Sequence, residues 1–384
     1  MRHSVVAAVV SVAAAATFSA TPASTRTSDP DTLTVHEWGT FTSIAGPDGM
    51  AVDWHPLGGP SDLPCFVERN ALNVKGALVG TVRMETPVLY FYAARETTVD
   101  VRVRFHRGVI TEWFPHASVG QRGAPTVPGS EGVIAWKRVK VSPDGAEDFP
   151  VEPASSHYYT ARHTNAAAVQ AGSQADKFLF YRGVGRFMPP IAATVDAGGR
   201  VTIRNQVPDL IEEVILFSND HGRMRYELRH IAGGESADDP SRNGQPPGGE
   251  LEKMLVAGGL YPEEASAMVE TWRDSWFEEG TRLFYVVPRQ LIDSVLPLDI
   301  NPQPNDIVRV FVARTELITP ATENEITRAL LAGDFDTLRT YGRFLEEIGR
   351  RMIANAAEPD RRALEERLQR AYSAMMTLPD RCRT

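Results

Sequence analysis

The segment Thr34-Val35-His36-Glu37-Trp38-Gly39-Thr40-Phe41-Thr42 combines ionisable and apolar side chains at the spacing of a β-strand. Successive side chains of a strand point to opposite faces. One face therefore carries Val35, Glu37, Gly39 and Phe41, and the other carries His36, Trp38, Thr40 and Thr42. The pattern predicts an apolar face that must also accommodate the carboxylate of Glu37.

A hairpin is expected directly after this strand. Ala45-Gly46-Pro47-Asp48-Gly49 has the composition of a turn, and the alternation resumes from Ala51 to His55. The expected register places Val52 and Trp54 on the face of Glu37. It places Asp53 and His55 on the opposite face.

Glu37 has a structural and a functional interpretation. Burying a carboxylate is costly unless it is paired, so the structural interpretation is an ion pair with an arginine such as Arg182, Arg186 or Arg204. The functional interpretation is a general acid or base that works with Glu85 or Glu112. Two carboxylates with His36, Trp38, Arg182 and Arg186 as substrate-binding groups would suit a sugar ring, which stacks on aromatic faces.

Asp53 and His55 are candidate ligands for a divalent metal ion, the only cofactor that the sequence suggests. Residues two apart on a strand share a face, which brings both side chains within reach of one ion. In the expected register His36 lies roughly 13 Å from His55, at about 3.3 Å per residue, so a third ligand must come from elsewhere. The alternative is a pair of solvent-exposed side chains.

The N-terminus predicts export. Met1-Arg2-His3 precedes an apolar run rich in Val and Ala and then small residues, which indicates a signal peptide over residues 1–23, with an uncleaved anchor as the alternative. The expected location is secreted or periplasmic, with no membrane span after signal removal. Cys65 and Cys382 form either one disulfide or two free thiols.

Composition and missing motifs exclude several classes of protein. A net charge of -9 over 384 residues argues against nucleic acid as a partner, because phosphate binding needs a basic surface. The sequence lacks G-x-S-x-G, S-x-x-K, H-E-x-x-H, C-x-x-C and P-loop motifs. The usual signatures of serine hydrolases, zincins, thioredoxin-like proteins and nucleotide triphosphatases are therefore missing.

The predicted fold class is α+β. An antiparallel, sandwich-like β-rich body covers residues 30–232, a linker or mobile loop covers 233–249, a mixed helix and strand unit covers 250–318, and a helical tail covers 319–384. A helix that starts at Pro262 carries an apolar stripe that ends in Trp272 and Trp276. This stripe is expected to pack on the strand from Leu283 to Val287, with a binding stripe as the alternative.

Three functional hypotheses follow. The first is an exported hydrolase of a glycan or other envelope polymer, with Glu37 and a second carboxylate as acid and base. The second is a non-catalytic envelope module that binds a ligand or a protein partner. The third is a metal-dependent hydrolase that uses Asp53 and His55.

Overall fold

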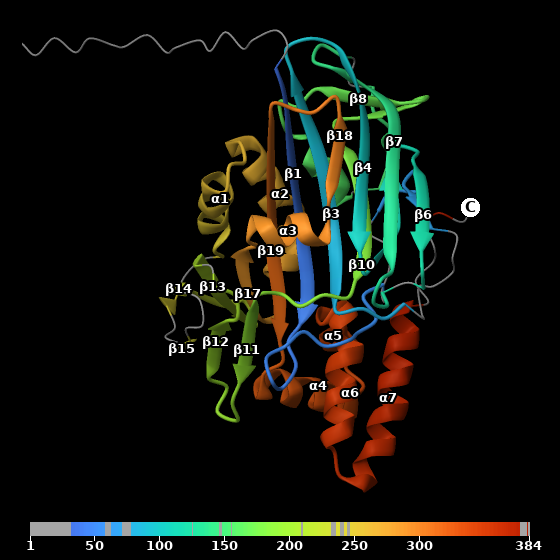
Figure 1. The fold of residues 1–384 in the computed structure, drawn as a ribbon. Coiled ribbons are helices and arrows are strands. Elements are labelled where there is room, and N and C mark those ends of the chain that lie inside the picture. Colours follow the sequence, from blue (N-terminus) through green and yellow to red (C-terminus); the bar gives the residue numbers. More distant parts are fainter. Residues whose placement is uncertain are drawn as a thin grey trace, which may run out of the picture.

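The computed structural model describes residues 32–57, 63–70, 78–124, 126–145, 148–154, 156–208, 210–231, 236–238, 242–243, 246–376 and 382. The predicted signal peptide, residues 1–23, lies outside the described residues. The α+β prediction is confirmed, with mostly antiparallel sheets in the N-terminal part and helices in the C-terminal half (Figure 1).

Strands of the described residues form three sheets. The ten-stranded sheet has the spatial order β16 (Arg242–Asn243), β14 (Arg223–Ile231), β13 (Ile211–Asp220), β17 (Gly280–Val286), β19 (Asp306–Leu317), β1 (Leu33–Ile44), β3 (Val82–Ala93), β10 (Leu179–Gly185), β5 (Gly108–Phe114) and β2 (Glu68–Arg69). The six-stranded sheet contains β18 (Leu298–Asn301), β4 (Thr97–His106), β7 (Glu131–Ser142), β8 (Ala168–Ala171) and β9 (Gln174–Asp176), with β6 (Ser118–Arg122) paired to β7. The three-stranded sheet contains β11 (Ile191–Val195), β12 (Val201–Asn205) and β15 (Ser236–Asp238).

Strand β1 lies in the middle of the ten-stranded sheet. It pairs in parallel with β19 and antiparallel with β3, so both of its edges are occupied. Because β19 belongs to the predicted mixed unit and β3 to the predicted β-rich body, one sheet joins the two regions. The short strands β15 and β16 lie within the predicted linker.

The predicted hairpin is wrong beyond its turn. Ala45 and Ala51 form an isolated bridge, and the amide of Gly46 donates to the carbonyl of Met50 over 2.7 Å. The amide of Val52 still donates to the carbonyl of Ile44 over 3.0 Å, but from Asp53 onward the chain does not pair along β1, because β3 and β19 already use its backbone groups. Trp54 instead bridges Gly80.

The two faces of the ten-stranded sheet are covered differently. The face of Val35 and Phe41 packs against the six-stranded sheet and forms a sandwich core. The face of Trp38 packs under α1 (Gly248–Ala257), α2 (Pro262–Trp276) and the 3-10 helix η1 (His157–Arg162). The rings of Trp276 and Phe284 lie 5.6 Å apart, so the predicted packing of the α2 stripe on the sheet is confirmed.

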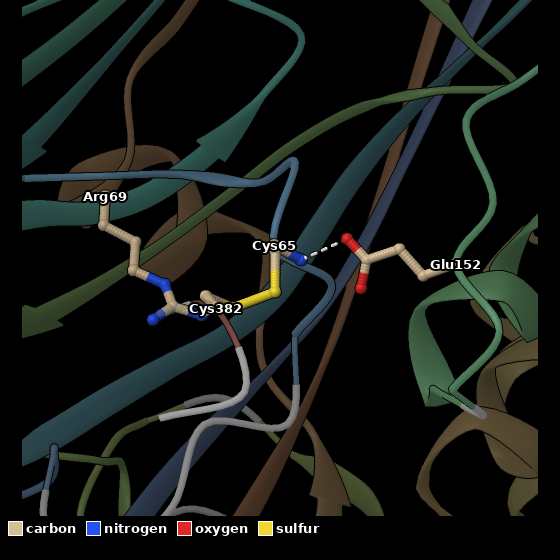
Figure 2. The surroundings of a disulfide bond; sticks show 4 residues. All are labelled: Cys65, Arg69, Glu152 and Cys382. Atoms are coloured by element: carbon tan, nitrogen blue, oxygen red, sulfur yellow. Dashed lines mark hydrogen bonds between the residues drawn. A yellow bond between two sulfur atoms is a disulfide. The ribbon is translucent and has the colours of Figure 1, made fainter. Parts of the chain in front are cut away.

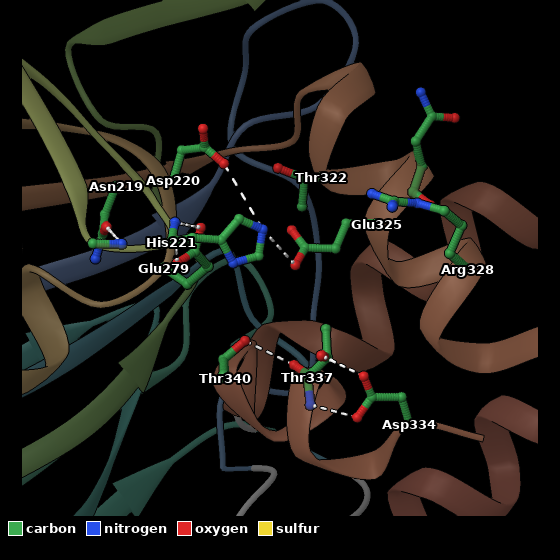
Figure 3. A network of polar contacts seen from close by, with 12 residues as sticks. Asn219, Asp220, His221, Glu279, Thr322, Glu325, Arg328, Asp334, Thr337 and Thr340 are labelled. Carbon is green, nitrogen blue, oxygen red and sulfur yellow. Dashed lines mark hydrogen bonds and ion pairs between the residues drawn. The ribbon is translucent and has the colours of Figure 1, made fainter. Parts of the chain in front are cut away.

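The C-terminal helices pack at the end of the sheet, around Ile44, Trp54 and Ile318 (Figure 1). They are α4 (Pro320–Ala332), α5 (Phe335–Thr340), α6 (Leu345–Asn355) and α7 (Glu358–Met376), with the short 3-10 helix η2 (Gly342–Phe344) before α6 and the separate helix α3 (Arg289–Val295) before β18. Figure 3 shows His221 of the β13–β14 turn beside Glu325 of α4, with Nε2 and Oε1 3.4 Å apart. Among the described residues no helix is long and apolar enough to cross a membrane.

Of the two alternatives that the sequence left open for the cysteines, a disulfide or two free thiols, the structure shows the disulfide. Cys65 and Cys382 form a disulfide with Cα atoms 5.2 Å apart. Figure 2 shows the backbone amide of Cys65 donating to Glu152, over 2.6 Å, and Arg69 of β2 beside the sulfur of Cys382. The bridge therefore attaches the end of the chain next to an edge strand of the ten-stranded sheet.

Candidate functional site

Four neighbouring strands change register at the same level of the sheet. On β1, the single residue Gly39 lies opposite Thr86 and Pro87 of β3. The pairing of β10 with β3 also shifts between Phe180 and Gly183, and β5 has one extra residue, Thr111, opposite β10. We call these irregular positions of β1, β3, β10 and β5 the bulge line. Bulges redirect side chains and are common beside functional sites.

The local sequence explains why the bulge forms here. Thr86 has a φ of 48°, in the left-handed region that costs a β-branched residue about 1 to 2 kcal/mol. Gly39 opposite has no room for a side chain, since an added Cβ would lie 2.7 Å from a ring carbon of Phe311. The surrounding sheet thus imposes a strained conformation on Thr86, as is typical of functional sites.

Three of the predicted site residues lie together on the bulge line. Glu85 is opposite Thr40 on β1, and Arg182 of β10 is opposite Glu112 of β5. In the strand order β3-β10-β5, Arg182 therefore lies between the two carboxylates. Glu85, Arg182 and Glu112 are 2%, 3% and 7% exposed. The Arg182 guanidinium is 5.8 Å from the Trp272 ring, which shows that this row faces α2.

Both surfaces that meet here carry buried polar atoms without a hydrogen-bond partner among the described residues. On the sheet they are the hydroxyl groups of Thr40, Thr42 and Thr86; on α2 they are the hydroxyl groups of Thr271 and Ser275 and the indole nitrogens of Trp272 and Trp276. Trp272 lies over β10 and Trp276 over β17, so the last turns of α2 cross the strands between them. Each of these buried groups has a hydrogen-bonding capacity that no described group of the protein satisfies.

His36 and Trp38 lie on the same face, nearer the start of β1. His36 is 2% exposed, and its Nδ1 is 2.7 Å from Glu264 of α2. Glu264 also accepts hydrogen bonds from the Tyr92 hydroxyl, over 2.9 Å, and from the Tyr261 amide, over 2.8 Å. Because a carboxylate only accepts, Nδ1 of His36 is the donor, and the pair anchors the first turn of α2 to the sheet. Burial and the charge of Glu264 raise the pKa of Tyr92.

Glu37 lies on the other face, away from Glu85 and Glu112. Its carboxylate accepts hydrogen bonds from Arg309 and from the hydroxyl of Tyr181, each over 2.5 Å. The expected ion pair is therefore present, but its arginine is Arg309 and not Arg182, Arg186 or Arg204. Burial is the largest single influence on the pKa of Arg309 and lowers it, but the charges of Glu37 and Tyr181 and the hydrogen bonds to Glu37 and Asp293 together raise it above its ordinary value. The sheet separates Glu37 from the other two predicted carboxylates.

Asp53 and His55 do not lie on a strand beside β1. Asp53 pairs with the predicted substrate-binding residue Arg186 over 2.8 Å, and Nδ1 of His55 is 3.6 Å from Glu346 of α6. Within the described ranges, no group of three or more His, Cys, Asp or Glu side chains is placed to hold a metal ion.

Sequence reasoning missed the residues contributed by distant elements. Glu264 and Arg309 become neighbours of β1 only through long-range packing and pairing. Pro87 gave no local signal for the conformation of Thr86, because proline favours an extended backbone in the residue before it, whereas the φ of Thr86 is 48°. No protein-family model matches the chain, and no curated protein matches it at a significant level. The site is therefore interpreted from its geometry.

Proposed function

We propose that this chain is an exported protein that binds a sugar unit of an envelope glycan on the bulge line, beneath α2. The observation that carries the proposal is the row of Glu85, Arg182 and Glu112 facing the Trp272 ring. Sugar hydroxyl groups both donate and accept hydrogen bonds, and sugar rings stack on aromatic faces. Carboxylates, a guanidinium group, threonine hydroxyls and indole rings together meet both needs.

Export is supported by two independent features. The first 23 residues have the charge and hydropathy pattern of a signal peptide. The Cys65–Cys382 disulfide is of the kind that persists in oxidising compartments.

Entry of a ligand requires α2 to move. Glu85, Arg182 and Glu112 are all buried under this helix and its neighbours. The polar atoms on the inner surface of α2 reduce the cost of separating the two surfaces, because water satisfies them when the helix lifts.

Binding can be measured by isothermal titration of the mature protein with oligosaccharides released from envelope glycans. Glu85→Gln and Glu112→Gln should each weaken binding at least about tenfold, the effect of one lost charged hydrogen bond of about 1.5 kcal/mol or more. Glu96→Gln is the matched control, because the Glu96 side chain is 60% exposed on the surface. The proposal fails if wild-type protein binds none of the oligosaccharides, or if the two variants bind as tightly as the control.

Hydrolysis is a second candidate function, favoured by the placement of Glu85 and Glu112. Their strands are two steps apart, which separates the backbones by about 10 Å. Carboxyl groups about 6.5 to 9.5 Å apart characterise inverting glycosidases. A reducing-end assay tests this: Glu85→Gln and Glu112→Gln should abolish sugar release, and binding without release by wild-type protein identifies a binding protein only.

The third hypothesis, a metal-dependent hydrolase, gains least support, because Asp53 is already paired with Arg186. Elemental analysis of protein purified without chelator tests it directly. The metal hypothesis would be supported if wild-type protein holds one divalent ion per chain and the variants Asp53→Asn and His55→Ala hold none.

A further inference from the structure

A cavity of about 220 Å³ lies on the face of the ten-stranded sheet opposite the bulge line. One of its lining residues, Leu216 of β13, belongs to the core on the sandwich face. Gly199 and Val201 line the cavity from β12 and the turn before it, and Thr319, the N-cap of α4, lines its side. The cavity is therefore separate from the sugar site proposed under α2.

Three polar side chains form a row along the sheet in this cavity. Arg225 of β14 is opposite Ser218 of β13, and Ser218 is opposite Thr281 of β17. Opposite residues share a face, and neighbouring strands lie about 4.8 Å apart, so the row extends over about 10 Å. All three residues line the cavity. The face thus changes here from the apolar core at Leu216 to polar side chains two residues further along.

The side chains of this row have unused hydrogen-bonding capacity. Among the described residues, no group of the protein is hydrogen-bonded to the Arg225 guanidinium or to the hydroxyls of Ser218 and Thr281. Glu227, the other charged residue of the lining, is bound instead to Arg229 over 2.8 Å. Arg225 is exposed and the two hydroxyl-bearing residues are half-buried, so the row leads from solvent into the cavity.

These groups match a carboxylate with a short apolar chain. A guanidinium group binds a carboxylate through two parallel hydrogen bonds, and hydroxyl groups donate to its oxygens. Leu216 and Val201 offer apolar contacts to the rest of the ligand. Glu227 repels a doubly charged phosphate more strongly than a singly charged carboxylate. Since drug-sized ligands occupy about 300 to 1,000 Å³, this cavity suits a smaller molecule.

We propose that the cavity binds a small monocarboxylic acid, whose carboxylate lies against Arg225, Ser218 and Thr281. The ligand carries one negative charge at the polar row and a short hydrocarbon part toward Leu216. This site lies on the opposite face of the sheet from the bulge line, so the proposal does not rest on glycan binding.

The test is isothermal titration of the mature, disulfide-bonded protein at pH 8, in a buffer without carboxylate or phosphate. The probes are butyrate, neutral butyramide and inorganic phosphate. Butyrate should bind at least about tenfold more tightly than butyramide, which lacks the charge that strengthens hydrogen bonds to a guanidinium group. Butyrate should also bind more tightly than phosphate. Added salt should weaken butyrate binding, because Arg225 is exposed.

Substitutions along the row locate the carboxylate. Arg225→Gln should weaken butyrate binding at least about tenfold, and Ser218→Ala and Thr281→Val should each weaken it about threefold. Arg204→Gln is the control for loss of charge, because Arg204 is exposed on β12 and does not line the cavity. Thr98→Val, at an exposed position of β4, is the control for loss of a hydroxyl. Both controls should bind butyrate like wild type.

Each contrary outcome removes a defined part of the proposal. Equal affinity for butyrate and butyramide, or no binding of either, overturns the carboxylate site. Tighter binding of phosphate than of butyrate overturns the assignment of a monocarboxylic acid. Butyrate affinity that survives Arg225→Gln overturns the location at the row. The glycan-binding proposal fails or stands separately, through the oligosaccharide titrations of Glu85→Gln and Glu112→Gln.

Discussion

Glu37 shows how one residue can be placed correctly by its sequence pattern while its partner cannot. The alternation of the segment predicted a carboxylate on an apolar face, and Glu37 is completely buried there. Its partner Arg309 is 272 residues away, on a strand that pairs in parallel with β1. No local pattern specifies such a pairing, so the arginines considered from the sequence were nearer in the chain.

Removing the charge of Glu37 should destabilise the protein. In Glu37→Gln, Arg309 stays buried opposite a neutral amide, and breaking a buried pair costs about 3 to 5 kcal/mol. Urea unfolding of wild type and variant measures this change. Glu358→Gln is the control, because the Glu358 side chain is 84% exposed in its pair with Arg361. A variant as stable as wild type that has lost its activity would show instead that Glu37 is catalytic.

At the scale of elements, helix α2 was largely predictable. Pro262 opens the helix and its apolar stripe packs on β17, as its 3.6-residue period indicated. The polar part of its buried surface was not predicted, because periodicity places a Trp side chain on the buried face but does not tell whether its indole N–H is hydrogen-bonded there. The bulge line was missed for a related reason: four strands must be aligned before their irregularities coincide.

Glu264 should control how readily α2 leaves the sheet. In Glu264→Gln, the donors His36, Tyr92 and the Tyr261 amide lose a charged acceptor, so stability should fall by about 1.5 to 3 kcal/mol. Amide hydrogen exchange in the first turn of α2 should accelerate. Glu263→Gln, one residue earlier and exposed, should exchange like wild type. Unchanged exchange in Glu264→Gln would contradict this anchoring role.

Helix α5 should lose stability in acid. The hydroxyl and amide of Thr337 donate to Asp334, as Figure 3 shows, and hold the pKa of Asp334 below its ordinary value. Because the folded pKa is the lower one, the stabilisation is complete above the unfolded pKa, near 3.9, and is lost as pH falls through the folded pKa.

Asp334→Asn keeps an acceptor at this position but removes the titration. The urea midpoint of wild type minus that of Asp334→Asn should therefore decrease as the pH is lowered from 6 to about 2.5. Asp336→Asn, at a side chain that is 92% exposed, should show a smaller change. If the difference in urea midpoint between wild type and Asp334→Asn does not change with pH, Asp334 makes no such contribution to stability.

At the scale of the whole molecule, the class was predictable and the connectivity was not. The alternation of the strands and the period of the helices gave the α+β class. The sequence analysis placed a linker at residues 233–249, but β17 and β19, which follow this segment, lie in the same sheet as β1 and β3, which precede it. Pairing between strands far apart in sequence leaves no local signal, whereas the two cysteines at least raised a long-range contact as one of two alternatives.

The disulfide should stabilise the whole fold. It closes a loop of 317 residues, for which loop-closure entropy sets a limit of about 5 kcal/mol. Reduction should therefore lower the urea midpoint of wild-type protein. The double variant Cys65→Ser, Cys382→Ser should have the lower midpoint with or without reductant. If reductant leaves the wild-type midpoint unchanged, the bridge contributes nothing to stability.

The parallel pairing of β1 with β19 also constrains how the protein is made. A ribosome releases β1 early, and the antiparallel partner β3 follows within 60 residues, but the other edge of β1 stays open until Leu317 has emerged. A nascent chain with an unpaired central strand can recruit the wrong strand from another copy. A truncated chain that ends before Asp306 lacks β19, so one edge of its β1 stays unpaired. The chain must therefore be synthesised through β19 before both edges of β1 can pair.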